Sequence, residues 1–169
     1  NSVNTGPLWC GCLNAGEPNH MNQRLQTRRL LIVEDEPGDA RLMQLAIVRN
    51  GFATEMSSAA DGREAMRCLR REGARWAGAV HPDLILLDLK MPGQGGLEFL
   101  AAIKQDETLR AIPVVVVTTS LLEADVRRAY ELGAAGYVQK PADLREFIAT
   151  VRILGEYWFK LVRLPQNGE

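Results

Sequence analysis

The chain has 169 residues, of which 46% are hydrophobic and 24% are charged, values that are ordinary for one globular domain with a sizeable core. Its 20 Lys and Arg residues nearly balance 21 Asp and Glu residues, so the net charge of -1 provides no basic field for nucleic acid. No apolar run approaches the roughly 20 residues needed to cross a bilayer. We therefore expect a cytoplasmic protein without a membrane or nucleic-acid partner.

The first 28 residues contain Asn, Gly and Pro without periodicity and lack the hydrophobic core of a signal peptide. We interpret residues 1–28 as a flexible segment or an artificial extension. Cys10, Cys12 and His20 are too few, at unconvincing spacing, to indicate a metal site. Cys68 falls in a helical pattern, where a buried free thiol is the usual state, so we expect no disulfide framework.

From Arg29 onward, apolar runs alternate with segments of helical period, which is typical of βα units wound on a parallel sheet. Right-handed crossovers place helices on both faces of such a sheet. The strand-like runs are residues 30–33, a weaker run at 52–57, then 84–87, 114–117 and 136–139. The helical segments are 37–50, one from Asp61-Gly62 to Gly73, one after Gly95-Gly96, 122–132, and a last one from about Leu144.

Polar residues stand at the ends of four of these strands. Glu34 and Asp35 follow the first strand, Asp88 follows the third, Thr118 the fourth and Lys140 the fifth. Because the carboxyl ends of parallel strands meet at one edge of a sheet, we expect these side chains to converge on one site. Strand ends also carry polar residues simply because they border solvent, but five such residues in this order favour a functional site.

The expected cluster of carboxylates needs a compensating cation, since two charges 4 Å apart interact by about 4 kcal/mol even at an effective dielectric constant of about 20. Mg²⁺ prefers carboxylate, carbonyl and water oxygens, and Glu34, Asp35 and Asp88 supply the carboxylates. Asp88 is the natural nucleophile, because a carboxylate can attack a phosphoryl group to form an acyl phosphate. Thr118 and Lys140 are expected on the opposite side of that group.

These motifs resemble the receiver domains of two-component response regulators, over about residues 29–154. The resemblance implies a doubly wound (βα)₅ fold of the flavodoxin-like and chemotaxis-regulator-like class, with strand order 2-1-3-4-5. The matching pieces are Leu-Ile-Val-Glu34-Asp35-Glu36, Leu-Ile-Leu-Leu-Asp88-Leu-Lys-Met-Pro92-Gly93, Ile-Pro113-Val-Val-Val-Val-Thr118 and Ala-Ala-Gly-Tyr137-Val-Gln-Lys140-Pro141.

The same resemblance implies that a sensor histidine kinase phosphorylates Asp88. Mg²⁺ would be held by Asp35, Asp88 and the backbone carbonyl of Lys90, with Glu34 assisting through water. Such a protein is a phosphoacceptor that promotes its own Mg²⁺-dependent phosphorylation and dephosphorylation rather than a conventional enzyme. We expect it to signal by protein contact, because only 15 residues follow Leu154, too few for a DNA-binding output domain.

Three further roles follow from the resemblance. Thr118 and Lys140 would sense the charge added by phosphorylation. The peptide bond before Pro141 would be cis, which costs about 1 kcal/mol in an X-Pro bond, and would aim the Lys140 ammonium into the site. Tyr137 stands where the family has an aromatic switch, although a half-buried strand tyrosine with a solvated hydroxyl is equally compatible with its position.

The last helix continues as an apolar extension over residues 155–169. A core-facing stripe at helical spacing comprises Leu144, Ile148, Val151, Leu154, Trp158, Leu161 and Val162, while Ile153, Tyr157 and Phe159 fall outside it. The extension can fold back on its own domain or form a C₂ homodimer contact, and we favour the dimer. The candidate contact residues are Tyr157, Trp158, Phe159, Leu161, Val162 and Leu164.

The ending Tyr-Trp-Phe-Lys-Leu-Val-Arg-Leu-Pro165 is also similar to the tails of single-domain regulators that work with bacterial phytochromes. This similarity implies a bacteriophytochrome as the partner kinase. Two other functions remain open. A flavodoxin-like cofactor-binding protein would need Gly, Ser or Thr donors after the first strand, where the chain has Glu34 and Asp35. A phosphorylation-independent scaffold of receiver shape would not need Asp88 or Lys140.

Overall fold

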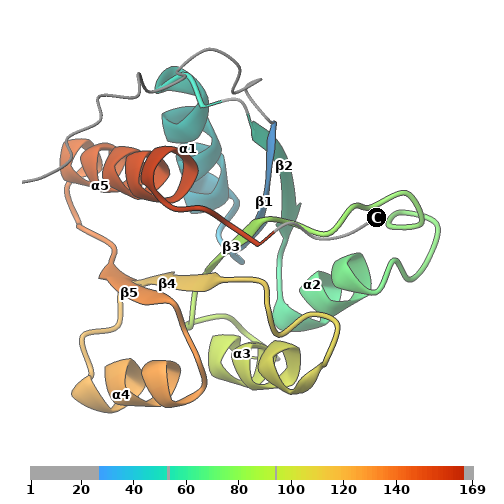
Figure 1. Ribbon diagram of the computed structural model, residues 1–169. Helices are drawn as coiled ribbons and strands as arrows, with labels where there is room; N and C mark the ends of the chain where they lie inside the picture. The colour runs from blue at the N-terminus through green and yellow to red at the C-terminus, as the bar shows by residue number, and fades with distance from the viewer. Residues whose placement is uncertain (1–26, 53, 94, 166–169) are drawn as a thin grey trace, which may run out of the picture.

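A computed structural model describes residues 27–52, 54–93 and 95–165. The five expected strands form one parallel sheet in the order β2-β1-β3-β4-β5, which confirms the predicted fold class and strand order (Figure 1). The weak strand lies two residues later than predicted. The strands are β1 (Arg28–Val33), β2 (Thr54–Ala59), β3 (Leu84–Leu87), β4 (Val114–Thr118) and β5 (Gly136–Gln139).

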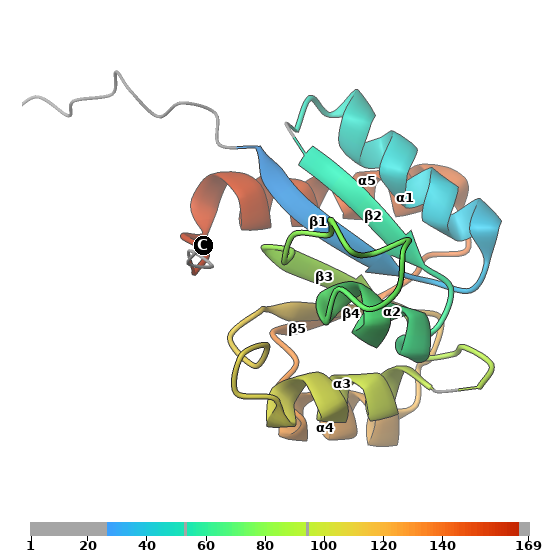
Figure 2. The ribbon, with the colours of Figure 1, turned by 90° about the vertical axis from the view of Figure 1, so that its right-hand side faces the viewer.

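Helices cover both faces of the sheet (Figures 1 and 2). On one face lie α1 (Pro37–Arg49), α5 (Leu144–Glu156) and the π-helical turn η1 (Tyr157–Leu161) that extends α5. On the other lie α2 (Gly62–Leu69), α3 (Gly96–Gln105) and α4 (Glu123–Glu131). Within the described part of the chain, none of these helices combines the length and the apolar character that a membrane span requires.

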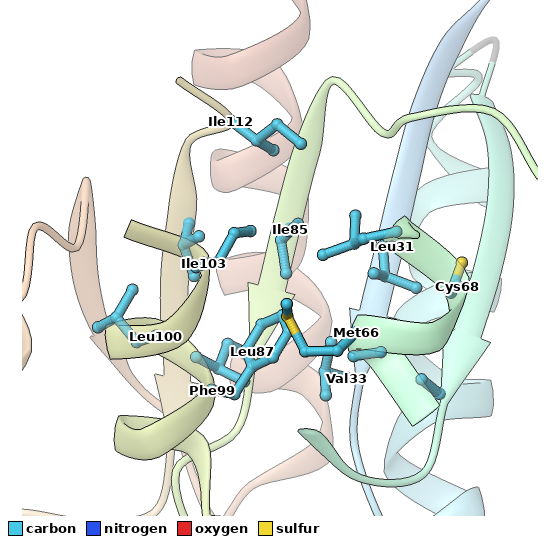
Figure 3. Close-up of a cluster of buried hydrophobic side chains, with 14 of the residues drawn as sticks. Leu31, Val33, Met66, Cys68, Ile85, Leu87, Phe99, Leu100, Ile103 and Ile112 are labelled. Atoms are coloured by element: carbon cyan, nitrogen blue, oxygen red, sulfur yellow. The ribbon is translucent and has the colours of Figure 1, made fainter. Parts of the chain in front are cut away.

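Strand side chains alternate between two cores, as the period of two in a β-strand requires. On the α2–α3–α4 side, Leu31 and Ile85 belong to one buried cluster with Phe99 and Leu100 of α3 (Figure 3). On the α1–α5 side, their strand neighbours pack against α1, α5 and η1. Because both faces are covered, β3 and β4 are buried along their whole length, and their sequences are continuous apolar runs.

Helix starts follow local signals in the sequence. Pro37 occupies the first turn of α1, where its missing N–H costs no hydrogen bond. Asp61 caps α2 by accepting a hydrogen bond from the Glu64 N–H at 2.7 Å, and Asp143 caps α5 in the same way. Cys68 of α2 is a buried free thiol, as expected.

The C-terminal extension folds back on its own domain. Trp158 and Leu164 are buried in the α1–α5 core, and Phe159 and Val162 pack against that core. The Phe159 ring lies edge-on to Phe52, with a centroid separation of 5.6 Å. Four of the six residues predicted for a dimer contact therefore contribute to the fold of a single chain.

The predicted core-facing stripe of the last helix was wrong at Leu144 and Leu161. Leu144 in the first turn is 55% exposed and Leu161 is 77% exposed, whereas Phe147, which the stripe omitted, is buried. The chain changes from α-helix to π-helix at Tyr157, so a projection at 3.6 residues per turn loses its phase there. The predicted N-terminal segment lies outside the described residues except for Thr27 and Arg28, and Arg28 begins β1.

Candidate functional site

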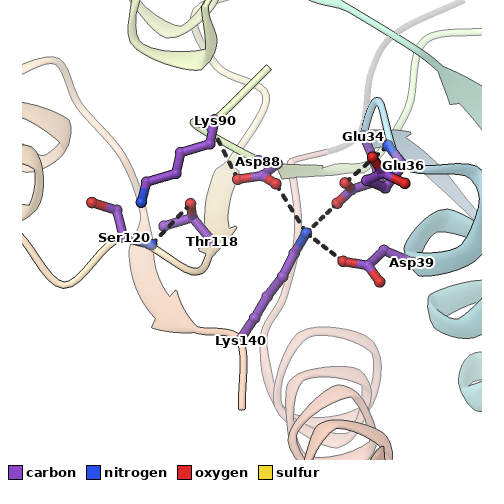
Figure 4. Close-up of polar contacts among 8 residues, drawn as sticks. All are labelled: Glu34, Glu36, Asp39, Asp88, Lys90, Thr118, Ser120 and Lys140. Carbon is purple, nitrogen blue, oxygen red and sulfur yellow. Dashed lines mark hydrogen bonds and ion pairs between the residues drawn. The ribbon is translucent and has the colours of Figure 1, made fainter. Parts of the chain in front are cut away.

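The carboxyl ends of β1, β3, β4 and β5 bring the predicted residues together. The Asp88 N–H donates to the Val33 carbonyl at 2.9 Å, which places Asp88 beside Glu34. The Lys140 N–H donates to the Thr118 carbonyl at 2.7 Å, so these two residues also adjoin. Figure 4 shows the side chains of Asp88, Glu34 and Lys140 directed toward one another at this edge.

The Lys140 ammonium lies at the centre of the site. Its Nζ atom donates to Asp88 Oδ2 at 2.9 Å, to Asp39 Oδ2 at 3.0 Å, and to Glu34 Oε2 (Figure 4). The Lys140 side chain is only 4% exposed. Burial acts to lower the pKa of Lys140, but hydrogen bonds to Glu34 and Asp88 outweigh it and raise the pKa above its ordinary value. The ammonium is therefore a permanent positive charge.

Glu34, Asp35 and Asp88 each offer a carboxylate oxygen, and these oxygens lie within 4.8 Å of one another. Burial raises the pKa of Glu34 to about 7, against the opposing hydrogen bond from Lys140. Three convergent carboxylates form a donor set that a hard divalent cation such as Mg²⁺ prefers. The residues present therefore fit the predicted metal.

The Asp88 side chain is an ionised carboxylate. Its Oδ1 accepts the Lys90 N–H at 3.1 Å, and its Oδ2 accepts the Lys140 ammonium at 2.9 Å. Burial acts to raise the pKa of Asp88, but the hydrogen bonds from Thr118, Lys140 and Lys90 outweigh it and leave the pKa below its ordinary value. At neutral pH the carboxylate carries the charge that a nucleophile needs.

A second polar network joins this site to α4. The Ser120 N–H donates to Thr118 Oγ1 at 3.4 Å, and the fully buried Ser120 hydroxyl donates to Asp125 in the first turn of α4. The Tyr137 hydroxyl donates to the Ser120 carbonyl at 3.1 Å. The Tyr137 hydroxyl thus has a protein partner, whereas one of the two interpretations of the sequence expected this hydroxyl to be solvated.

The predicted cis peptide before Pro141 was wrong, because all peptide bonds in the described part of the chain are trans. The trans isomer is the favoured one for an X-Pro bond by about 0.5–1 kcal/mol. In this conformation Lys140 Nζ reaches all three of its carboxylate partners, so its placement does not depend on the cis isomer.

The sequence analysis did not predict three residues that belong to the site. Asp39 lies in the first turn of α1, where acidic residues are common because of the helix dipole, so its contact with Lys140 had no distinct signal. Ser120 and Asp125 are ordinary residues for the turn that precedes a helix and for its first turn. Only the folded chain brings these side chains to Lys140 and to Tyr137.

The sequence profile of the response regulator receiver domain matches residues 30–152. The chain belongs to this family. Its strand order and acidic site agree with those expected of a receiver domain, and membership favours this assignment over a flavodoxin-like protein.

Two named proteins are similar in sequence to this receiver domain. Response regulator Rcp1 from Synechocystis sp. is 39% identical over 136 residues, which cover 80% of this chain and 92% of Rcp1. The regulatory protein FilR2 of Methanothrix harundinacea, whose name refers to methanogenesis, is 41% identical over 137 residues, covering 80% of this chain and 86% of FilR2.

Two solved structures are similar to the receiver domain described here. The phosphorylated cyanobacterial phytochrome response regulator RcpA matches with a TM-score of 0.79 and 41% identity, covering 83% of this chain and 99% of RcpA. The Mn²⁺-bound form of Rcp1 matches with a TM-score of 0.77 and 38% identity, covering 82% of this chain and 99% of that chain. One relative thus has a phosphorylated structure and another binds a divalent cation.

Proposed function

We propose that this receiver domain accepts a phosphoryl group from a histidine kinase on Asp88 and passes the signal on by protein contact. The observation that carries the proposal is the ionised Asp88 carboxylate, which accepts a hydrogen bond from Lys140 and lies within 4.8 Å of carboxylate oxygens of Glu34 and Asp35. In the transfer, a carboxylate oxygen forms a bond to phosphorus as the bond from phosphorus to the kinase histidine breaks.

Glu34, Asp35 and Asp88 would hold Mg²⁺, together with the backbone carbonyl of Lys90. When bound, the ion would neutralise charge on the transferring phosphoryl oxygens. Lys140 places a permanent positive charge beside Asp88, and the Thr118 hydroxyl offers a hydrogen bond there. Catalysis then consists of positioning and electrostatic stabilisation by groups already at the sheet edge.

Thr118 and Tyr137 would convert the added charge into a change at α4. Phosphorylation adds about -1.5 to -2 charges and three acceptor oxygens, which attract the Thr118 hydroxyl and the Lys140 ammonium. Thr118 is bonded to Ser120, and Ser120 is bonded to both Tyr137 and Asp125. A displacement of Thr118 would therefore disturb the hydrogen bonds that hold the start of α4.

The test uses a small phosphodonor with Mg²⁺ and intact mass spectrometry. Wild-type protein is expected to gain one phosphoryl group, and Asp88→Asn to gain none. Asp83→Asn is the matched control, because Asp83 is an aspartate at the opposite end of β3 whose carboxylate bonds the Arg29 N–H. Labelling of Asp88→Asn at the wild-type rate would refute the assignment, and a protein that takes no label would favour the scaffold function.

The name of RcpA, a cyanobacterial phytochrome response regulator, supports a bacteriophytochrome as the kinase, and the similarity to FilR2 makes other sensor kinases the competing choice. Phosphotransfer from a panel of purified histidine kinases distinguishes these partners. Fastest transfer from a bacteriophytochrome is the expected result. Faster transfer from a kinase without a light sensor would overturn this part of the proposal.

We also propose a homodimer contact on the exposed face of the end of α5 and the extension. Ile153, Tyr157 and Leu161 recur every four residues and are 59%, 50% and 77% exposed, so they form an apolar strip outside the fold of the single chain. Leu161→Asp is expected to weaken a dimer measured by sedimentation, with the unfolding midpoint unchanged at protein concentrations too low for the dimer to form. A wild-type protein that sediments as a monomer would refute the contact.

A further inference from the structure

Asp39 is a third acidic partner of the lysine in the candidate site. Its Oδ2 atom lies 3.0 Å from Lys140 Nζ, and Asp39 belongs to the first turn of α1 rather than to a strand end. A lysine ammonium has three N–H donors, and Lys140 directs them to Asp39, Glu34 and Asp88. The three acceptors together determine where the positive charge is held.

Asp39 differs from the other two acceptors in its position. Glu34 and Asp88 belong to the group of carboxylates that can hold a cation, whereas Asp39 does not. Its side chain is 44% exposed, compared with 1% for Glu34 and 7% for Asp88. Asp39 therefore keeps its carboxylate free for Lys140 when the other acceptors are used for metal or phosphoryl binding.

We propose that Asp39 is a positioning residue for phosphoryl transfer, which holds the Lys140 ammonium over the reaction site from α1. When Asp88 becomes an acyl phosphate, one of its oxygens is bonded to phosphorus, and Lys140 exchanges that acceptor for a phosphoryl oxygen. The bond to Asp39 persists through the exchange and limits the freedom of the four-carbon lysine side chain. This inference rests on the proposed function.

An acidic residue in the first turn of a helix has a simpler role, because it stabilises the positive end of the helix dipole. Loss of a negative charge also favours the approach of an anionic phosphodonor. Glu36 separates these effects from a role in positioning. It precedes α1 as its N-cap residue and is exposed, but it makes no ion pair with Lys140 in the described structure.

The experiment measures the rate of labelling of Asp88 by acetyl phosphate at saturating Mg²⁺, as a function of donor concentration. Asp39→Asn is compared with wild type, with Glu36→Gln and with Asp39→Glu, which restores the carboxylate. We expect Asp39→Asn to lower the maximal rate by about fivefold relative to Glu36→Gln, the upper range for a partly exposed ion pair. The half-saturating donor concentrations of these two variants should agree, and Asp39→Glu should recover much of the rate.

The possible outcomes separate this inference from the proposed function. If wild type takes label at Asp88 but Asp39→Asn matches Glu36→Gln, the proposed function stands and the positioning role is overturned. If Asp39→Asn changes only the half-saturating donor concentration, the residue acts through its charge on the donor and the role is again overturned. If wild type takes no label, both fail. Thermal unfolding of each variant confirms that the rates compare folded proteins.

Discussion

Replacing Gly96 by alanine tests how closely α3 packs on the strand end that carries Asp88. Gly96 is the first residue of α3, and its N–H donates to the Leu89 carbonyl at 3.3 Å. A Cβ atom at this position would lie 2.6 Å from Leu89 Cα, 3.0 Å from the Asp88 carbonyl carbon and closer still to the Asp88 carbonyl oxygen. Because these are backbone atoms, side-chain rotation cannot relieve the collision, and either α3 or the Asp88 segment must move.

Overpacking of this kind costs about 1–3 kcal/mol, and the higher helix propensity of alanine returns about 0.5–1 kcal/mol. Because the collision is with backbone, we expect the upper part of that range, so Gly96→Ala should lower the free energy of unfolding by about 2 kcal/mol. For a chain of this length the melting temperature should fall by about 4–8 °C. Urea denaturation followed by circular dichroism measures the difference directly.

Gly95→Ala is the matched control. A Cβ atom there meets nothing within 4 Å, and the φ angle of -65° suits any residue. Gly95 is the N-cap of α3, where glycine is preferred to alanine, so this variant should lose at most about 1 kcal/mol. Equal stability of the Gly95→Ala and Gly96→Ala variants would refute the argument from close backbone packing.

Three other predictions concern the extension, the α4 network and the metal. Trp158→Ala should lower the free energy of unfolding by about 3 kcal/mol, whereas Leu161→Ala should change it by less than about 0.5 kcal/mol; equal losses in urea denaturation would contradict the fold-back of the tail. Tyr137→Phe removes a hydrogen bond to the loop before α4 and should cost about 1 kcal/mol, while Tyr130→Phe, at an exposed tyrosine, should cost nothing measurable. Mg²⁺ at ten times its Kd should raise the free energy of unfolding by about 1.4 kcal/mol in calorimetry. Asp35→Asn should weaken that response, and an unchanged response would show that the Asp35 carboxylate is not a ligand.

The strand ends explain why so much of the candidate site was predictable. A polar residue directly after an apolar strand has a known position in a parallel sheet, because all strands point the same way and their carboxyl ends share one edge. Glu34, Asp88, Thr118 and Lys140 could therefore be grouped before their distances were known. No comparable rule connects a helix residue such as Asp39 to a particular strand end.

The sequence by itself determined the alternation of strands and helices, the parallel sheet and the residues at its carboxyl edge, because periodicity and strand direction are local properties that repeat along the chain. Only the tertiary structure decided the partners of Lys140 and the place of Trp158 in the core of its own domain. These features depend on contacts between residues far apart in the chain, or on a local change from α-helix to π-helix. The apolar extension is the clearest case: its composition predicted burial, but packing against Phe52 and the α1–α5 core decided that most of this burial occurs within one chain.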